Sequence, residues 1–182
     1  MPNWAIGPVD ITGTRAAVLA FSDRFISDDE QCTVPGRRYF ARSFLESPRE
    51  LTRSDIMSVF EGSSETEERL FTLYISFAWS ATSCMIHGYP QNNQTECITL
   101  GEACVEDQVS VVIRTTEPGL CFEEEIHCGK DGECEDIEHE LRVFKCPECG
   151  ETCSIASFED PNEYLCCECG HEGMVPYETE EE

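Results

Sequence analysis

The residues with the clearest chemical potential are six cysteines in the segment CPECGETCSIASFEDPNEYLCCECG, residues 146–170. Four of them form two C-x-x-C turns that are separated by sixteen residues and are each followed by glycine. Zinc in structural sites takes four thiolate or imidazole ligands in a tetrahedron, and one C-x-x-C turn supplies two neighbouring ligands. The spacing therefore predicts a zinc ribbon in which one zinc ion is bound by Cys146, Cys149, Cys166 and Cys169.

Between the two turns lies the sequence EDPN, which is typical of a chain reversal and predicts a hairpin that brings the two turns together. Because four protein ligands would fill the tetrahedron, no position remains for water or substrate, and we expect the zinc to stabilise the fold rather than to catalyse. Cys153 and Cys167 are left over. Cys167 could replace Cys166, although only Cys166 gives C-x-x-C spacing with Cys169.

A second group of potential ligands has looser spacing and allows two interpretations. It consists of His127, Cys128, Cys134 and His139. A second metal site is one interpretation, and a strand end followed by a polar loop is the other, which the loose spacing favours. The remaining cysteines lie among apolar neighbours or in loops, and most are expected to be small buried side chains. They are Cys32, Cys84, Cys97, Cys104 and Cys121.

Acidic residues dominate the charge of the chain. Its 182 residues include 37 Asp and Glu against 12 Lys and Arg, for a net charge of −25. Residues 1–60 carry seven arginines and eight acids, so nearly all of the excess lies in residues 61–182. Such a field argues against phosphate binding over the whole surface.

Neither a secretion signal nor an apolar run of about 20 residues occurs in the sequence. We therefore expect a cytoplasmic protein with no membrane partner. In a reducing compartment the thiols would be available to metal rather than joined in disulfides.

The elements that must position these residues follow from hydrophobic periodicity. We expect an N-terminal strand, a helix capped by Thr14, and a central strand with Trp79 on its buried face. In chain order the predicted elements are a strand at 5–12, a helix at 14–26, a strand at 37–45, a short helix at 54–60, a strand at 70–79, a broken helical connection at 80–106, and strands at 108–115 and 120–128. This order predicts an α+β protein with a ferredoxin-like sheet and helices on one face. We expect a domain at 1–128, an acidic linker at 129–142, and a zinc ribbon with an acidic tail at 143–182.

Several short segments resemble the YubB-like ferredoxin-domain family of phages and plasmids. They are MPNW at 1–4, ITG at 11–13, SPREL at 47–51, FAWS at 77–80 and TEPGLCF at 116–122. The resemblance covers residues 1 to about 128. It implies a ferredoxin-like fold and mobile-element ancestry, and it supplies no catalytic residue.

Three functions are compatible with these observations. A nuclease-like enzyme on the ferredoxin-like domain is one, although no motif shows a nucleophile with its base or an open metal site. A nucleic-acid-binding accessory protein is the second, because aromatic residues interleave with a cluster of arginines. That cluster comprises Arg37, Arg38, Arg42, Arg49 and Arg53. The third, which we favour, is a non-catalytic interaction module whose acidic surface engages a host protein with a basic surface, as a nucleic-acid mimic. Acidic charge that merely confers solubility is the alternative to mimicry.

Overall fold

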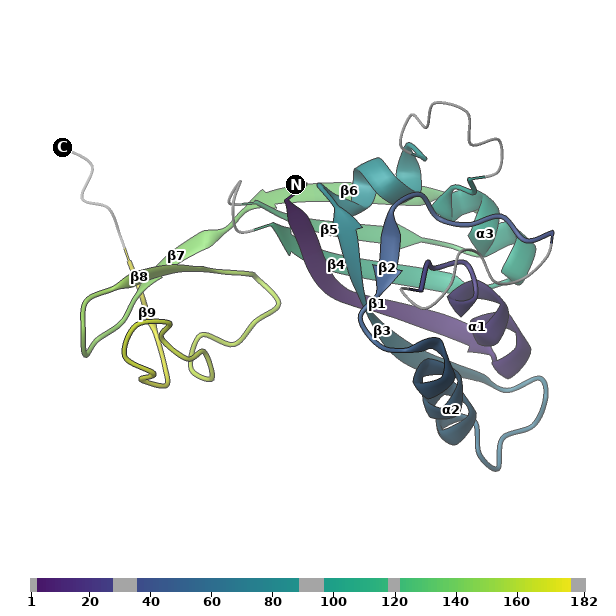
Figure 1. Cartoon of the computed structure of the whole chain (residues 1–182), viewed down its shortest axis with the longest axis horizontal. Helices are drawn as coiled ribbons and strands as arrows, with labels where there is room; N and C mark the ends of the chain where they lie inside the picture. Colours follow the sequence, from purple (N-terminus) through teal and green to yellow (C-terminus); the bar gives the residue numbers. More distant parts are fainter. Residues whose placement is uncertain (1–2, 28–35, 89–96, 118–121, 178–182) are drawn as a thin grey trace.

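The structure is a computed structural model that describes residues 3–27, 36–88, 97–117 and 122–177. Two β-sheets and a few helices make up these ranges (Figure 1). The fold is therefore α+β, as the sequence predicted. No helix in the described ranges is both long enough and apolar enough to cross a membrane.

The larger sheet has six antiparallel strands in the order β2-β3-β1-β4-β5-β6. Their bounds are β1 (Trp4–Thr14), β2 (Ser43–Leu45), β3 (Glu68–Ala78), β4 (Ser110–Glu117), β5 (Phe122–Cys128) and β6 (Cys134–Glu140). Because β1 and β2 are both antiparallel to β3, they run parallel to each other with β3 between them. In the same way β3 and β4 run parallel, with β1 between them.

One face of this sheet carries the core. Val9 of β1 pairs with Leu73 of β3 and with Ile113 of β4, and all three side chains are buried. The alternate positions face the other way, so Ile6 and Tyr74 are exposed. This alternation is the period-2 pattern of a sheet with one packed face and one solvated face.

Helices cover the packed face. They are α1 (Arg15–Ser22), α2 (Arg49–Val59), the π-helix η1 (Thr82–Ile86) and α3 (Leu100–Asp107). The side chain of Thr14 accepts a hydrogen bond from the backbone N–H of Ala17 and so caps α1 as predicted. Thr99 and Glu102 form a reciprocal capping box at the start of α3. The buried aromatic side chains of Phe21 and Phe25 join the helical layer to the core of the sheet.

Two predicted elements differ from the observed ones in the first half of the chain. The strand expected at 37–45 is reduced to the three residues of β2, because the chain turns at Arg42, where φ is 48°. The alternation of residues 70–79 predicts Trp79 on the buried face of the strand, but β3 ends at Ala78. Trp79 takes a φ of 77° and is 39% exposed.

The acid-rich segment 129–142, predicted as a linker, mostly belongs to the sheet. The N–H of Gly129 donates to the carbonyl of Glu133, and the chain reverses there and returns as β6 beside β5. Leu141 is the one residue between β6 and the next strand, and it is buried.

The second sheet forms the C-terminal part of the described chain. Its strands are β7 (Arg142–Lys145), β8 (Thr152–Ile155) and β9 (Val175–Pro176), in the order β8-β7-β9. We call residues 142–177 the C-terminal region. Its backbone meets the larger sheet where the N–H of Ser157 donates to the buried carboxylate of Glu123, at 2.5 Å.

Candidate metal centre and arginine cluster

Two backbone turns of the same design present the predicted cysteines. In the first, the N–H of Cys146 donates to the carbonyl of Glu151 at 2.7 Å, and the N–H of Gly150 donates to the carbonyl of Cys146 at 3.0 Å. In the second, Cys166 and Gly170 repeat these contacts, with distances of 2.8 and 2.9 Å. Both glycines have a positive φ, 78° and 71°, which side-chain-bearing residues rarely adopt. The glycine after each C-x-x-C motif therefore lets the turn close.

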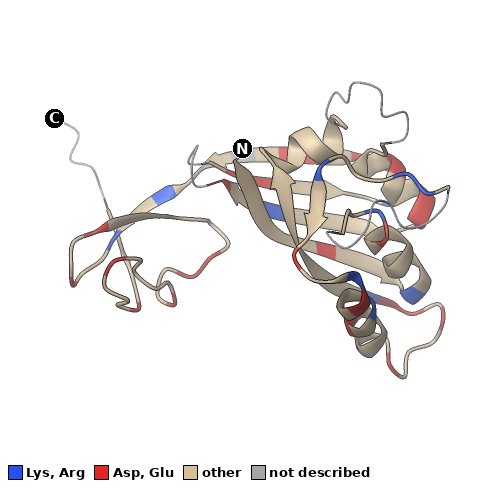
Figure 2. Ribbon diagram, in the orientation of Figure 1, with Lys and Arg blue, Asp and Glu red and all other residues tan. Residues whose placement is uncertain are grey.

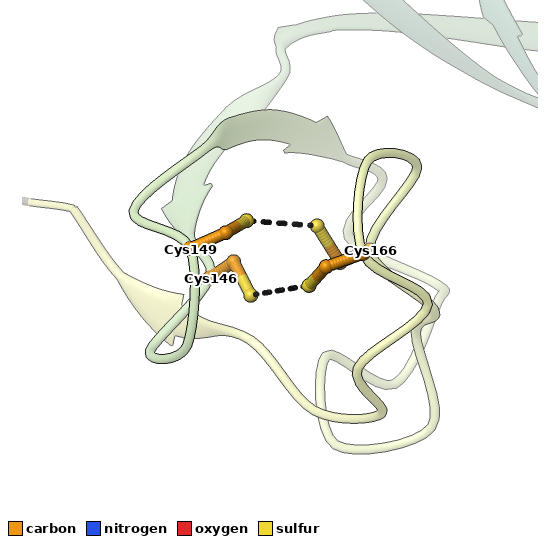
Figure 3. A group of neighbouring side chains, drawn as sticks. Cys146, Cys149 and Cys166 are labelled. Atoms are coloured by element: carbon orange, nitrogen blue, oxygen red, sulfur yellow. Dashed lines mark hydrogen bonds between the residues drawn. The ribbon is translucent and has the colours of Figure 1, made fainter.

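The two turns bring four sulfur atoms together (Figure 3). The Sγ atoms of Cys146, Cys149, Cys166 and Cys169 all lie within 4.8 Å of one another. The pairs Cys146–Cys169 and Cys149–Cys166 are each separated by 3.6 Å. A tetrahedral site with metal–sulfur bonds of about 2.3 Å has sulfur–sulfur distances of about 3.8 Å. These four cysteines could therefore bind a metal ion.

Cys146 and Cys166 are the inner pair of this cluster. Both are buried and pack with Phe144, Ile155 and Met174 in the small core of the C-terminal region. The other two cysteines of the cluster are exposed. One side of the cluster therefore rests on apolar side chains, and the other side faces solvent.

The backbone of the second turn favours a thiolate. Hydrogen bonds from the backbone at Cys169 and Glu168 lower the pKa of Cys166 to about 7. At Cys149 a hydrogen bond from the backbone of Glu151 acts in the same direction. It is outweighed by desolvation and by the neighbouring thiols, which raise the pKa of Cys149 to about 12. Crowded thiols without a cation oppose one another's ionisation, and a bound dication would remove that opposition.

The second group of potential ligands does not form a metal site. Cys128 and Cys134 face each other across the β5–β6 hairpin and form a disulfide, so neither thiol is available as a ligand. His127 contacts the carboxylate of Glu125 through Nε2 at 2.8 Å. His139 pairs in register with Glu123. Within the described ranges, the four-cysteine cluster is the one group of potential ligands that gathers.

The arginine cluster is engaged with acidic side chains. Arg49 and Arg53 both contact Asp23, at 3.2 and 2.6 Å, and Arg37 lies 3.9 Å from the same carboxylate. Arg38 contacts Glu102 at 3.2 Å and also contacts Glu106. Arg42 occupies the tight turn before β2. Phosphate would therefore have to compete with carboxylates for at least four of the five predicted arginines.

The aromatic residues of this segment are largely occupied as well. Phe40 is fully buried and packs against Phe21 and Phe25, with ring centroids 5.2 and 4.9 Å apart. Phe44 stacks edge to face on Trp4. Phe40 therefore has no face available for a nucleic-acid base.

The sequence did not indicate a role for Arg24, yet its side chain contacts two carboxylates, Glu106 and Asp107, that the arginine cluster also approaches. Its side chain is 4% exposed and donates to Asp107 through Nε at 2.5 Å and to Glu106 through Nη2 at 2.9 Å. Asp107 is 5% exposed, so the pair lies in the interior. Because little water reaches either charge there, each is stabilised mainly by the other. Arg24 lies just after the end of α1, and no local signal reveals the distant Asp107.

Glu124 is a second buried charge that the sequence did not indicate. Its carboxylate accepts hydrogen bonds from the N–H of Ala81 at 2.7 Å, from the N–H of Thr82 at 3.2 Å and from the hydroxyl of Thr115 at 3.1 Å. These contacts fasten the start of η1 to β4 and β5. The carboxylate is therefore fully engaged in holding the fold.

No family model, no curated protein and no solved structure matches this chain.

Proposed function

We propose that this protein is a zinc-binding, non-catalytic interaction module. The observation that carries the proposal is the convergence of four cysteine sulfurs, two from each of two matching turns, at separations suited to a tetrahedral metal ion. Four thiolates favour zinc among the common divalent ions, and a complete set of protein ligands makes the site structural. In this proposal the C-terminal region is a zinc ribbon.

We further propose that the first part of the chain has a ferredoxin-like fold. The strand order β2-β3-β1-β4, with a helix between β1 and β2 and another between β3 and β4, supports this assignment. Strands β5 and β6 would extend that sheet at one edge. The resemblance to the YubB-like family of phages and plasmids is consistent with this assignment and remains a proposal about ancestry.

The proposed binding partner of the module is a host protein with a basic, nucleic-acid-binding surface. The C-terminal region carries seven exposed acids against two basic residues, and no ion pair among the described residues includes one of those acids. Lys and Arg occur mainly around α1, α2 and the chain that joins them, where they pair with nearby acids (Figure 2). Unpaired carboxylates on a rigid scaffold can imitate the phosphates of a nucleic acid for a basic partner.

Charge variants of the full-length protein test this proposal. The first variant replaces Glu148, Glu151, Glu163 and Glu168 of the C-terminal region with glutamine. A control with the same change in net charge replaces four exposed acids on the other part of the molecule with the corresponding amides. These acids are Glu50, Asp55, Glu61 and Glu65. In pull-downs from host lysate, the wild-type protein and the control should recover a basic nucleic-acid-handling protein, and the first variant should not.

Competition and salt distinguish mimicry from other causes of binding. Free DNA should displace the recovered partner, and binding should weaken as salt rises through about 0.5 M because the attraction is screened. Equal recovery by both charge variants would contradict the proposal. If the purified protein instead shifts labelled DNA or RNA, and replacement of Arg37, Arg38 and Arg42 with alanine abolishes the shift, nucleic-acid binding is the correct function.

A further inference from the structure

Two thiols of the C-terminal region lie close together outside the metal centre. The Sγ atoms of Cys153, on β8, and Cys167, in the second turn, are 3.6 Å apart. This separation equals that of the two sulfur pairs inside the four-cysteine cluster. Neither sulfur belongs to the group that gathers within 4.8 Å, so the pair is a separate feature.

The pair is also accessible. Cys167 is exposed and Cys153 is partly buried beside Tyr164, whereas Cys84 and Cys104 of the larger sheet region are fully buried. A reagent in solution can therefore reach Cys167 directly, and Cys153 lies within reach of the sulfur that has reacted. An accessible thiol next to a resolving thiol is the arrangement of a site of reversible oxidation.

We propose that Cys153 and Cys167 form a disulfide when the protein meets a low-molecular-weight disulfide such as oxidised glutathione. The sulfur of Cys167 attacks one sulfur of the reagent, forms a mixed disulfide and releases one glutathione, which takes the proton that Cys167 gives up. The sulfur of Cys153 then attacks the sulfur of Cys167 and releases the second glutathione. Two cysteine thiols are oxidised, one reagent disulfide is reduced to two thiols, and the protein loses two hydrogens.

The disulfide would give the C-terminal region a cross-link that does not depend on metal. Cys153 and Cys167 are fourteen positions apart and enclose the EDPN turn. The bond joins β8 to the second turn, and the four-cysteine centre joins the first turn to the second. With the bond closed, the two halves of the region stay together when the metal is removed, because the unfolded chain is restricted. The inference uses the proposed zinc site only to shield its four ligands from the oxidant.

The test uses the full-length protein, reduced, loaded with zinc and freed of reductant. Its zinc content is measured before and after incubation with oxidised glutathione, and it is then digested at glutamates without reduction for mass spectrometry. The expected product joins the fragment with Cys153 to the fragment with Cys167, with zinc content unchanged. Cys153→Ser should give no cross-link and should leave one glutathione on Cys167, and Cys167→Ser should abolish the cross-link.

Two results would overturn the inference. One is a zinc-loaded protein that shows no Cys153–Cys167 link. The other is a cross-link that persists in Cys167→Ser with loss of zinc, because Cys166 would then be the oxidised residue. A protein with no zinc before oxidant is added would instead contradict the metal proposal. In that sample, preferential linkage of Cys153 to Cys167 over Cys146 to Cys169 would still support this inference.

Hydrogen exchange after chelation provides a second readout. The oxidised protein should keep slow amide exchange in β7 and β8, whereas the reduced protein should lose it. Equally fast exchange in both forms would show that the bond does not hold the region together.

Discussion

The two sheets of this protein are stabilised in different ways. The six-stranded sheet and its helices bury a continuous set of apolar side chains that runs from Ala5 to Cys128. The core of the C-terminal region consists of five buried residues, and two of them, Cys146 and Cys166, belong to the four-cysteine cluster. The larger region can fold on hydrophobic burial, whereas the smaller one has too little apolar surface for that.

The same residue type therefore has opposite roles in the two regions. Cys84 and Cys104 act in the sheet region as small apolar side chains. In the C-terminal region two of the five core residues are cysteines, and they belong to a cluster of four that could bind a metal ion. The environment of a thiol, and not its presence, decides which role it takes.

Metal removal should produce the largest difference between the regions. Zinc binding contributes on the order of 10 kcal/mol to the folding of small zinc-dependent units. Chelation, or Cys146→Ser, should therefore unfold residues 142–177 and leave β1, β3 and β4 protected. Hydrogen exchange combined with elemental analysis measures this. Cys153→Ser is the matched control, and one zinc per chain should remain in it; a Cys146→Ser protein with full zinc content would refute the assignment.

A cavity in the larger core should have the reverse effect. Phe77 is fully buried on β3, so Phe77→Ala should lower the free energy of unfolding of the sheet region by about 3–5 kcal/mol. Zinc content should stay unchanged. Tyr74→Ala, on the exposed face of the same strand, should cost about 1 kcal/mol or less. Denaturant titration followed by circular dichroism compares the two, and a larger loss for Tyr74→Ala than for Phe77→Ala would mean that the faces of β3 are assigned the wrong way round.

Breaking the buried ion pair between Arg24 and Asp107 should have the third-largest effect. Asp107→Asn leaves the interior guanidinium of Arg24 without its closest carboxylate, which should cost about 3 kcal/mol of stability. Glu67→Gln breaks the surface contact with Arg69 and serves as the control, with a much smaller change in melting temperature. Equal changes in the two melting temperatures would show that Arg24 is solvated in the folded protein.

The smallest expected effect concerns the chemical labelling of the two buried thiols of the larger sheet region. Burial raises the pKa of Cys84 to about 11 and that of Cys104 to about 12, so at pH 8 both remain protonated and shielded. Iodoacetamide should leave both unmodified in the folded protein and should modify both in denaturant. Peptide mapping gives the result, and rapid labelling of Cys104 under native conditions would place it outside the core.

The sequence predicted those parts of the fold that depend on local signals. Thr14 caps its helix, and the alternation in β3 is regular enough to identify a strand. Helix α2 begins at Arg49 rather than at Ser54, because Pro48 supplies a backbone conformation that leads directly into a helix. The strand predicted at 37–45 is interrupted by the turn at Arg42. Arg37 lies 3.9 Å from Asp107, which is far away in sequence, and no local pattern contains that information.

The cysteine sites were likewise predictable only where the signal is local in the sequence. The four clustered cysteines were identifiable because two C-x-x-C turns are local and self-sufficient. The pairing of Cys128 with Cys134 depends on the register of a hairpin. The second strand of that hairpin, β6, was not predicted because its acid-rich composition is not typical of a strand. Its signal was the turn sequence GKDG at 129–132, in which Gly132 has a φ of 83°.

The position of β6 determines where this protein can be divided. A fragment that stops at residue 128 would remove β6 and leave one edge of β5 unpaired, since its other edge is bonded to β4, and an exposed strand edge of this kind invites pairing with another copy of the fragment. It would also remove Asp136, which accepts a hydrogen bond from the hydroxyl of Thr82 at 2.9 Å. A cut after Leu141 keeps every strand of the larger sheet, so the first soluble fragment of this chain should end there.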